Sequence, residues 1–448
     1  MTSNSYKILL PIETTSRELL YKLVLGVKFA KQGFQSFVGA KEDIYRLFGQ
    51  ISPFVFFDKG YHAGISDKLY NLLNNYDSLL VSLDEEGGVD FKDMSTILAR
   101  YPEHFFEKAD LIFIWGRAQY DFLKANRLNF CKSHTVVSGH PRFELLKPQY
   151  HSLYEQQVSE IKREFGRYVL FCTNMGFGNN IRGNDFVRSN YGSRIRDLGK
   201  IIAFDKEKVK SYISLIMRLS AKLDCKVIIR PHPEEDHDTY RKAFSAFSKV
   251  KIIFRGAVIP WILGAEVMVH PDCTTGIESC MMEKLPLSYL PRFDETLCPF
   301  VPVKVSRCFT SEDEIVKFIV EGKYADMAVR ERHQLMQEYF SINKGSIDCI
   351  VKEVCSLVKK NKLSNFRDIS ISAQAIGNTR KCLGKALSHM RSVFANSGHA
   401  LMQNKRAGLD VANFSLMFNS TRKCLGVDES VSMDCVWPGL YRIVCRKS

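Results

Sequence analysis

The segment Lys226-Val227-Ile228-Ile229-Arg230-Pro231-His232-Pro233-Glu234-Glu235 decides the fold. Its apolar, largely β-branched residues predict a buried strand, which the two prolines end because they fix the backbone and remove donors. Helical spacing at 209–223 and at 239–247 makes it one strand of an alternating helix–strand series, and such a series predicts a parallel sheet. Ligands bind beyond the carboxyl ends of parallel strands, where Arg230 and His232 fall. A rigid imidazole near an arginine suits a nucleotide phosphate, although a His-Pro pair can also merely end a strand.

The chain has 448 residues, of which 45% are hydrophobic, enough for two domains of ordinary size and a tail. Its longest apolar runs, such as 111–115 and 259–263, are far shorter than the roughly 20 residues that span a bilayer. We therefore expect a cytoplasmic protein that neither crosses a membrane nor is secreted. The thirteen cysteines stand singly, without Cys-x-x-Cys or clustered His, so we expect neither disulfides nor structural zinc.

The formal net charge is +14. From residue 363 onward there are 12 Lys and Arg against 5 Asp and Glu, so about half of the excess lies in the last fifth of the chain. Basic and acidic residues are interspersed elsewhere, and no nucleic-acid motif is present. The charge therefore favours an anionic membrane surface or an acidic substrate over nucleic acid.

The strand–helix pattern predicts an α/β protein with two doubly wound, Rossmann-like domains that face a cleft, at 1–150 and 165–362, followed by a basic helical or irregular tail at 363–448. Strands are expected at 7–12, 34–38, 53–57, 78–83, 111–115 and 134–138, and then at 168–172, 227–230, 251–254, 267–270 and 286–290. A helical stretch is expected at 93–108. The polar segment 174–200 follows a strand end, so a functional loop is favoured over a disordered one.

The tail contains Thr-Arg-Lys-Cys-Leu-Gly twice, at 379–384 and 421–426. One pair of copies is too few for a solenoid. One interpretation is that the two copies are basic segments of a small appended module. The other is that they are a coincidence in a loosely ordered tail.

Three adjacent carboxylates, Asp84, Glu85 and Glu86, follow a predicted strand and precede Gly87 and Gly88. Mutual repulsion and partial burial are expected to raise at least one of their pKa values toward the range of a general base. The alternatives are an acidic turn that caps the next helix, or a metal site, which no visible further ligand completes.

A second polar turn runs from Asp272 to Ser279, after the predicted strand 267–270. The hydroxyls of Thr274 and Thr275 and the amide of Gly276 would form an anion site at a helix start. Ordinary N-capping by Asp272 or Thr274 is the alternative.

Gly139-His140-Pro141-Arg142 places a second His-Pro at the end of the first domain. His140 is a candidate acid, base or phosphate contact, and the Gly and Pro could equally shape a hinge. Glu13 and Arg17, after the first predicted strand, are further candidates.

As a set, Glu85-Glu86-Gly87, His232-Pro233 and Thr274-Thr275 resemble, in the same order, motifs of bacterial CMP-sialic-acid-using glycosyltransferases of the two-Rossmann (GT-B) architecture. Residues 5–360 more broadly resemble bacterial surface carbohydrate biosynthesis proteins. Related patterns occur in CMP-linked 3-deoxy-octulosonate transferases and in CDP-glycerol glycerophosphotransferases. In the latter, the segment that matches Asp272 to Ser279 usually carries Asp-Tyr-Ser-Ser, which this chain lacks.

The resemblance implies a glycosyltransferase that moves a sugar, such as a 2-keto-3-deoxy acid, from a CMP donor to a polysaccharide or lipid-linked acceptor, without metal or cofactor. His232, Thr274 and Thr275 would bind the donor phosphate, with Arg230, Pro233, Gly276 and Ser279 around it, while Glu85 or a neighbour would deprotonate the acceptor or act as nucleophile. The alternatives are a CDP-glycerol-type phosphotransferase, a UDP-sugar 2-epimerase and a non-catalytic scaffold in polysaccharide assembly.

Overall fold

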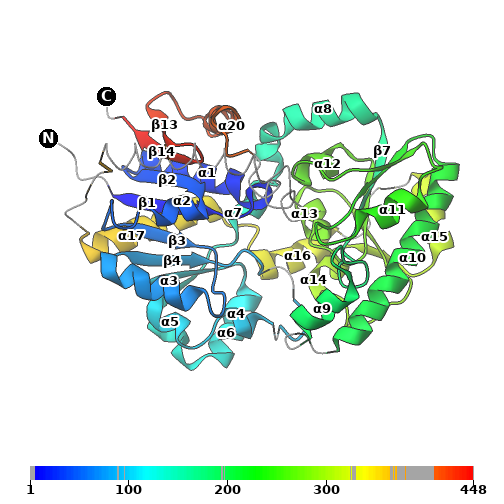
Figure 1. Ribbon diagram of the computed structural model, residues 1–448, viewed down its shortest axis with the longest axis horizontal. Coiled ribbons are helices and arrows are strands. Elements are labelled where there is room, and N and C mark those ends of the chain that lie inside the picture. The colour runs from blue at the N-terminus through cyan, green and yellow to red at the C-terminus, as the bar shows by residue number, and fades with distance from the viewer. Residues whose placement is uncertain are drawn as a thin grey trace. The chain divides into compact units, whose positions relative to one another are not determined.

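A computed structural model describes residues 6–446 except 88–89, 95, 193–194, 196, 323, 325–328, 364–366, 368, 371–378 and 380–407. The chain divides into two compact units. Unit 1 comprises residues 1–87, 97–145 and 338–448, and unit 2 comprises 88–96 and 146–337. Each unit contains one sheet of mainly parallel strands covered by helices (Figure 1), so the expectation of two Rossmann-like domains is confirmed.

The sheet of unit 1 has the strand order β13-β14-β2-β1-β3-β4-β5-β6. Its strands are β1 (Lys7–Ile12), β2 (Gln35–Ala40), β3 (Val55–Asp58), β4 (Leu79–Leu83), β5 (Leu111–Ile114), β6 (His134–Val137), β13 (Val431–Trp437) and β14 (Leu440–Cys445). Strands β1 to β6 are parallel, whereas β14 pairs antiparallel with both β2 and β13. The helices are α1 (Thr15–Lys31), α2 (Lys41–Tyr45), α3 (Ser66–Leu73), η1 (Asn74–Tyr76), α4 (Ile97–Arg100), α5 (Phe105–Lys108), α6 (Arg117–Asn126), η2 (Leu128–Lys132), α7 (Pro141–Glu144), α17 (Ser346–Asn361) and α20 (Val411–Cys424).

The described end of the chain is not an irregular tail. Residues 408–446 form α20 and the β13–β14 hairpin, which extends the first sheet beyond β2 (Figure 1). Tyr441 and Ile443 are fully buried, and the ring of Tyr441 stacks on Phe414 at 3.8 Å. The second Thr-Arg-Lys-Cys-Leu-Gly copy forms the C-terminal end of α20 and the turn after it, while 380–384 of the first copy lie outside the described residues.

Helix α17 also departs from the expected boundary at residue 362. It packs on α1 of unit 1, where Lys28 pairs with Asp348 at 3.0 Å. The chain passes from unit 2 to unit 1 within α16 (Val329–Phe340).

The sheet of unit 2 has the order β12-β11-β10-β7-β8-β9, with all neighbours parallel. Its strands are β7 (Tyr168–Cys172), β8 (Lys226–Arg230), β9 (Val250–Ile252), β10 (Val267–His270), β11 (Pro286–Tyr289) and β12 (Arg307–Phe309). Its helices are η3 (Pro148–Leu153), α8 (Glu155–Phe165), α9 (Gly183–Tyr191), α10 (Leu198–Lys222), α11 (His237–Ala243), α12 (Ile259–Gly264), α13 (Thr275–Met281), α14 (Phe300–Lys304) and α15 (Glu312–Glu321).

Two local expectations differ from the structure. The helix expected at 93–108 is replaced by the single turns α4 and α5, because Pro102 between them cannot continue a helix. The segment 174–200 contains α9 and the start of α10, so it is partly helical.

Each sheet has a point where the order of strands reverses. In unit 1 it lies at β1, which has β2 on one side and β3 on the other, and in unit 2 it lies between β7 and β10. Open α/β sheets bind ligands outside the carboxyl ends of the strands at such a point. A functional site is therefore expected at the carboxyl ends of the strands at these two points.

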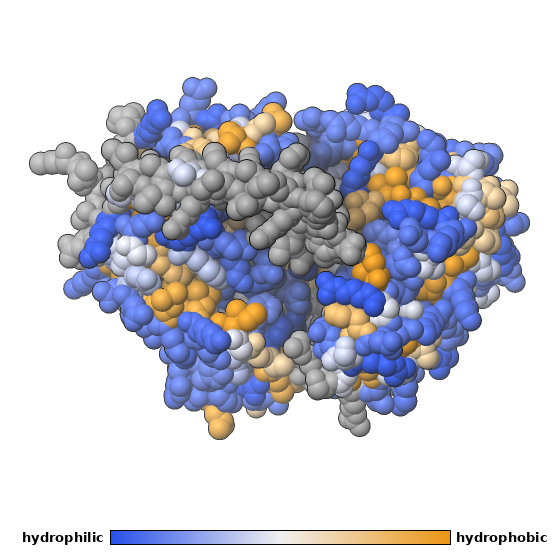
Figure 2. Space-filling view, viewed as in Figure 1, coloured by the Kyte–Doolittle hydropathy of each residue, from blue (hydrophilic) through white to orange (hydrophobic). Residues whose placement is uncertain are grey.

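On the face shown in Figure 2 hydrophilic residues predominate, with groups of apolar residues between them. No helix within the described ranges combines the length and the apolar composition needed to span a bilayer.

Candidate functional site

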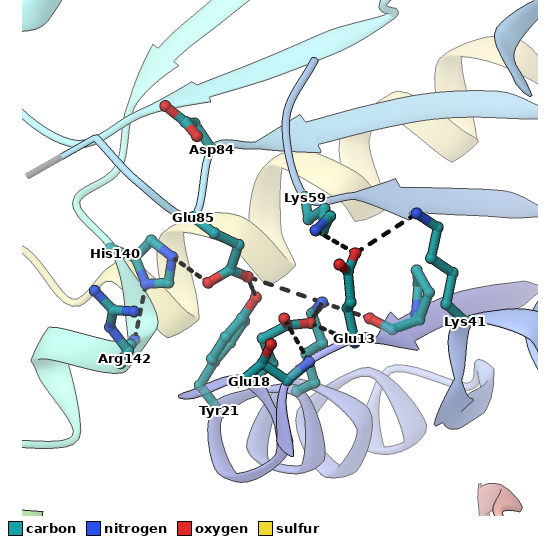
Figure 3. Close-up of polar contacts among 12 residues, drawn as sticks. Glu13, Glu18, Tyr21, Lys41, Lys59, Asp84, Glu85, His140 and Arg142 are labelled. Atoms are coloured by element: carbon teal, nitrogen blue, oxygen red, sulfur yellow. Dashed lines mark hydrogen bonds and ion pairs between the residues drawn. The ribbon is translucent and has the colours of Figure 1, made fainter. Parts of the chain in front are cut away.

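The site of unit 1 lies at the carboxyl ends of its strands. Asp84 and Glu85 follow β4, and His140 follows β6 (Figure 3). Gly139 permits this arrangement, because its φ is +76° and an added Cβ would lie 2.9 Å from the carbonyl oxygen of Phe340. Gly87 lets the loop after β4 pack on the Trp115 ring, since a Cβ would come within 2.9 Å of it. Gly88 lies outside the described residues.

Glu85 is at the centre of a buried ionic cluster. Its side chain is 6% exposed, and its Oε1 accepts a hydrogen bond from the Tyr21 hydroxyl and lies 3.8 Å from Nζ of Lys22. Its Oε2 lies 3.6 Å from Nε2 of His140. Burial opposes ionisation of Glu85, but His140, Lys22 and Arg142 outweigh it and hold the pKa of this carboxyl below its usual range.

His140 is held in one tautomer when neutral. Its Nδ1 accepts the backbone N–H of Arg142 at 3.0 Å, so the proton is on Nε2, facing Glu85. The Trp115 and Tyr21 rings meet its ring edge to face at 4.8 and 5.1 Å. Burial lowers the pKa of His140, although Glu85 opposes the shift. The neutral ring directs its Nε2 toward Oε2 of Glu85 at 3.6 Å, beyond hydrogen-bond distance, and as a fully buried group it does not reach solvent.

Asp84 and Glu86 differ sharply from each other. Burial raises the pKa of Asp84, with Arg100 opposing, so the raised pKa expected for this acidic run is found here and not at Glu85. Arg100 Nε lies 3.3 Å from Oδ2 of Asp84. Glu86 is 55% exposed and pairs at 3.8 Å with Arg17, so it is the acid of the run that solvent can reach.

Replacing Glu85 with Gln should lower the free energy of unfolding by about 3 kcal/mol, because the change removes the negative partner of a buried ion cluster. A carboxyl with a lowered pKa stabilises the fold fully above its ordinary pKa of about 4.3 and loses that contribution as the pH falls through its native pKa. The stability difference between wild type and Glu85→Gln should therefore shrink in acid, as measured by urea unfolding from pH 7 downward. Glu86→Gln is the control, with a change below about 0.5 kcal/mol. Equal effects of the two changes would contradict this picture.

In unit 2, Glu235 holds the turn that carries His232. The buried Oε1 of Glu235 accepts hydrogen bonds from the Thr173 hydroxyl at 2.6 Å and from the backbone N–H groups of Met175 and His232 at 3.2 and 3.0 Å. Its Oε2 accepts the Tyr240 hydroxyl at 2.5 Å. The turn after β8 is thereby fastened to the loop after β7. No role was predicted for Glu235, although its place two residues after the Pro-His-Pro turn was the available signal.

His232 is half-buried, and its Nδ1 accepts the backbone N–H of Glu234 at 3.3 Å. In the neutral ring the proton is therefore on Nε2. Pro233, next to it, is exposed. The strand-end position expected for His232 is found, with an imidazole that can donate a hydrogen bond.

Arg230 has a different role from the one expected. Its guanidinium donates to the carbonyl oxygens of Arg255 and Gly256, each at 2.8 Å, and lies over the Trp261 ring. Burial lowers its pKa to about 10. Both terminal amino groups hold the loop after β9, so Arg230 positions backbone instead of presenting its charge beside His232.

A buried lysine, Lys208, holds the turn after β10. Lys208 of α10 bridges Asp205 and Asp272 at 2.8 and 3.0 Å, and Asp205 accepts the backbone N–H groups of Phe177 and Gly178. The loops on both sides of the strand-order reversal, after β7 and after β10, are thus joined through one buried lysine.

The hydroxyl groups predicted to bind phosphate differ in their burial and orientation. Thr274 is half-buried ahead of α13 and Thr275 is largely buried, whereas the fully buried Ser279 hydroxyl donates to the carbonyl of Lys284. Ser279 therefore faces the core.

Gly276 packs on His270, because a Cβ would lie 2.4 Å from its Nε2. The His270 ring accepts the N–H of Cys273 on Nδ1 and contacts the Ser306 hydroxyl at 2.8 Å, and burial lowers its pKa to about 3. The structural role of His270 was not predicted, because in the sequence it is simply the last residue of an expected strand.

Among the residues that the structure describes, no group of three or more His, Cys, Asp and Glu side chains is placed to hold a metal ion.

The fold is shared with solved structures. The wall teichoic acid polymerase TagF matches with a TM-score of 0.52 at 10% identity, over 81% of this chain and 90% of that chain. A variant of the same polymerase gives 0.51 with the same coverage and identity. UDP-GlcNAc 2-epimerase of Methanocaldococcus jannaschii gives 0.46 at 12% identity, over 79% and 99% of the two chains, a likeness that adds nothing to the fold assignment.

No protein-family model matches the chain, and no curated protein sequence matches it. At these identities the likeness to TagF establishes a common fold, with two Rossmann-like units of parallel sheet.

Proposed function

We propose that this chain is a glycosyltransferase that moves a sugar from a CMP-activated donor to a surface polysaccharide or lipid-linked acceptor. Unit 2 would bind the nucleotide and unit 1 the acceptor. The observation that carries the proposal is the rigid His232 turn, which Glu235 fastens to the loop after β7 beside the strand-order reversal of unit 2.

The carboxyl ends of the unit 2 strands suit a phosphate leaving group. As the bond to the sugar breaks, negative charge grows on the phosphate, and fixed donors stabilise it. His232 would donate from Nε2 and Thr274 from its hydroxyl, with Thr275 next to them. The amide of Gly276, which the sequence suggested as a further donor, donates instead to the carbonyl oxygen of Cys273 at 3.0 Å. Arg230 and Ser279 would support the surrounding backbone. Protein donors take the place of a metal in this scheme.

The acceptor side needs a carboxylate that a hydroxyl can reach. Glu86 meets this requirement through its exposure, and we assign proton removal to it. Glu85 and His140, both buried, would fix the loop that carries Glu86, with Asp84 held by Arg100. A low pKa also makes Glu85 a weak base.

A glycerophosphotransferase is the second candidate, because the fold is that of the polymerase TagF. It would use His232 and the hydroxyls in the same way but transfer phosphorus. Analysis of the acceptor product separates the two. Both reactions release CMP, but only a glycosyltransferase leaves the acceptor bonded directly to the sugar, whereas a glycerophosphotransferase leaves a phosphate on it.

The net charge of +14 supports a location at an anionic membrane face. This would place the enzyme near lipid-linked acceptors. The attraction would weaken as salt screens it.

Cytidine nucleotides should stabilise the protein more than other nucleotides do. A ligand present at about 100 times its Kd adds roughly 2.7 kcal/mol to the free energy of unfolding. Thermal-shift titrations should therefore show a larger rise in Tm with CMP or CDP than with UMP, UDP or GDP at equal concentration. A larger rise with UDP would favour an epimerase or a UDP-sugar enzyme instead.

A further inference from the structure

Three neighbouring strands of unit 1 end in one charged cluster. Glu13 follows β1, Lys41 follows β2 and Lys59 follows β3. Both ammonium groups contact the same carboxylate oxygen of Glu13, with Lys41 Nζ at 3.6 Å and Lys59 Nζ closer (Figure 3). Of these three residues only Glu13 was predicted from the sequence, because the adjacency of the three strand ends depends on the order of strands in the sheet.

The cluster lies where ligands bind in this class of sheet. β1 has β2 on one side and β3 on the other, so the strand order reverses at β1. The crevice outside the carboxyl ends at such a reversal is the usual ligand site. The buried pair of Glu85 and His140 lies after β4 and β6, farther along the same edge.

The cluster is fixed in place but open to solvent. The backbone N–H of Glu13 donates to Oε2 of Glu18 at 3.0 Å, and Lys22 holds Glu18 at 2.9 Å. The side chains of Glu13, Lys41 and Lys59 are 39%, 25% and 18% exposed. A small ion can therefore reach the two ammonium groups, unlike the fully buried Lys22.

The three side chains of the cluster together carry one net positive charge, because two lysines share one carboxylate. Of the two acids next to these lysines in the sequence, Asp58 is buried and accepts the Tyr70 hydroxyl, whereas Glu42 is exposed. The excess positive charge of the cluster attracts an anion.

We propose that Lys41 and Lys59 form an anion subsite, which binds a phosphate or carboxylate group carried by the acceptor. Glu13 holds both ammonium groups at the strand ends before the acceptor binds. The subsite rests on the proposed function in one respect only, namely that its ligand is part of the acceptor. The shared chemistry is an oxyanion, supplied either by a phosphorylated carrier or by an acidic sugar.

The direct test observes the lysines themselves. The full chain is labelled with ¹³C-methyl groups on its lysines, saturated with CMP, and titrated by NMR with inorganic phosphate and, separately, with acetate. We expect saturable shifts of the Lys41 and Lys59 signals, assigned with Lys→Arg variants, and no shift at Lys31. Lys31 is the matched control, because it ends α1, the helix that begins just after Glu13. Tighter phosphate binding would indicate a phosphorylated acceptor, and acetate binding at least as tight would indicate an acidic sugar.

Unmoved signals of Lys41 and Lys59, or equal shifts at Lys31, would overturn the subsite. Because these reporters are local, that result leaves the nucleotide proposal standing, and absence of CMP binding leaves the subsite testable. As a second measurement, Lys41→Met and Lys59→Met should each weaken phosphate binding about tenfold, the effect of losing one charge-assisted contact, while Lys31→Met should not. In transfer assays the same two variants should raise KM for an anionic acceptor and leave kcat unchanged.

Discussion

Replacing His232 with alanine should slow transfer by a factor of about 10² to 10³ while the protein stays folded. The half-buried ring lies beyond the end of β8 and adds little to the core, whereas one fixed donor to a developing phosphate charge is worth about 3 kcal/mol in the transition state. The measurement is kcat with a CMP-activated donor, together with Tm.

His151→Ala is the matched control. His151 lies in η3 of the same unit, and its ring contacts the carbonyl of Leu146. Its loss should leave kcat unchanged. An unchanged rate in His232→Ala, or loss of the fold in that variant, would remove His232 from the mechanism.

Truncating the chain before Leu409 should abolish soluble, folded protein. The change removes α20, β13 and β14, uncovers the edge of β2, and exposes the apolar surface that buries Leu440, Tyr441 and Ile443. An unpaired, apolar strand edge promotes aggregation. Soluble yield and the Tm of any soluble fraction measure the effect.

A pair of point variants tests the same packing with less disruption. Ile443→Ala should cost about 2 to 5 kcal/mol, because it leaves a cavity in the core. Leu416→Ala, at a largely exposed position on α20, should cost less than about 0.5 kcal/mol. A soluble truncated protein with the same Tm as the full chain would show that the hairpin is dispensable.

The central strands were predictable because they are buried on both faces. The expected bounds 7–12, 168–172 and 267–270 coincide with β1, β7 and β10. A strand of this kind is a continuous apolar run between polar turns, and that pattern is local. The strands β12, β13 and β14 were missed. β12 and β13 are edge strands, and all three contain partly exposed residues, so they carry a weaker apolar signal.

The partners of the predicted site residues could not be predicted. The spacing of Arg230 and His232 suggested one phosphate site, but the Arg230 side chain faces the loop after β9. Glu85 was expected to be a base, yet Lys22 and Tyr21, about 60 residues earlier in the chain, hold it as a buried anion. Such contacts follow from the order of strands in the sheet, which a single sequence does not show.

The most direct test of the nucleotide site is a crystal structure of the protein with CMP. The phosphate should lie within hydrogen-bond distance of Nε2 of His232 and of the Thr274 hydroxyl, beyond the carboxyl ends of β8 and β10. Density for CMP away from both residues, or no CMP at concentrations that raise Tm, would contradict the assignment of this edge as the donor site.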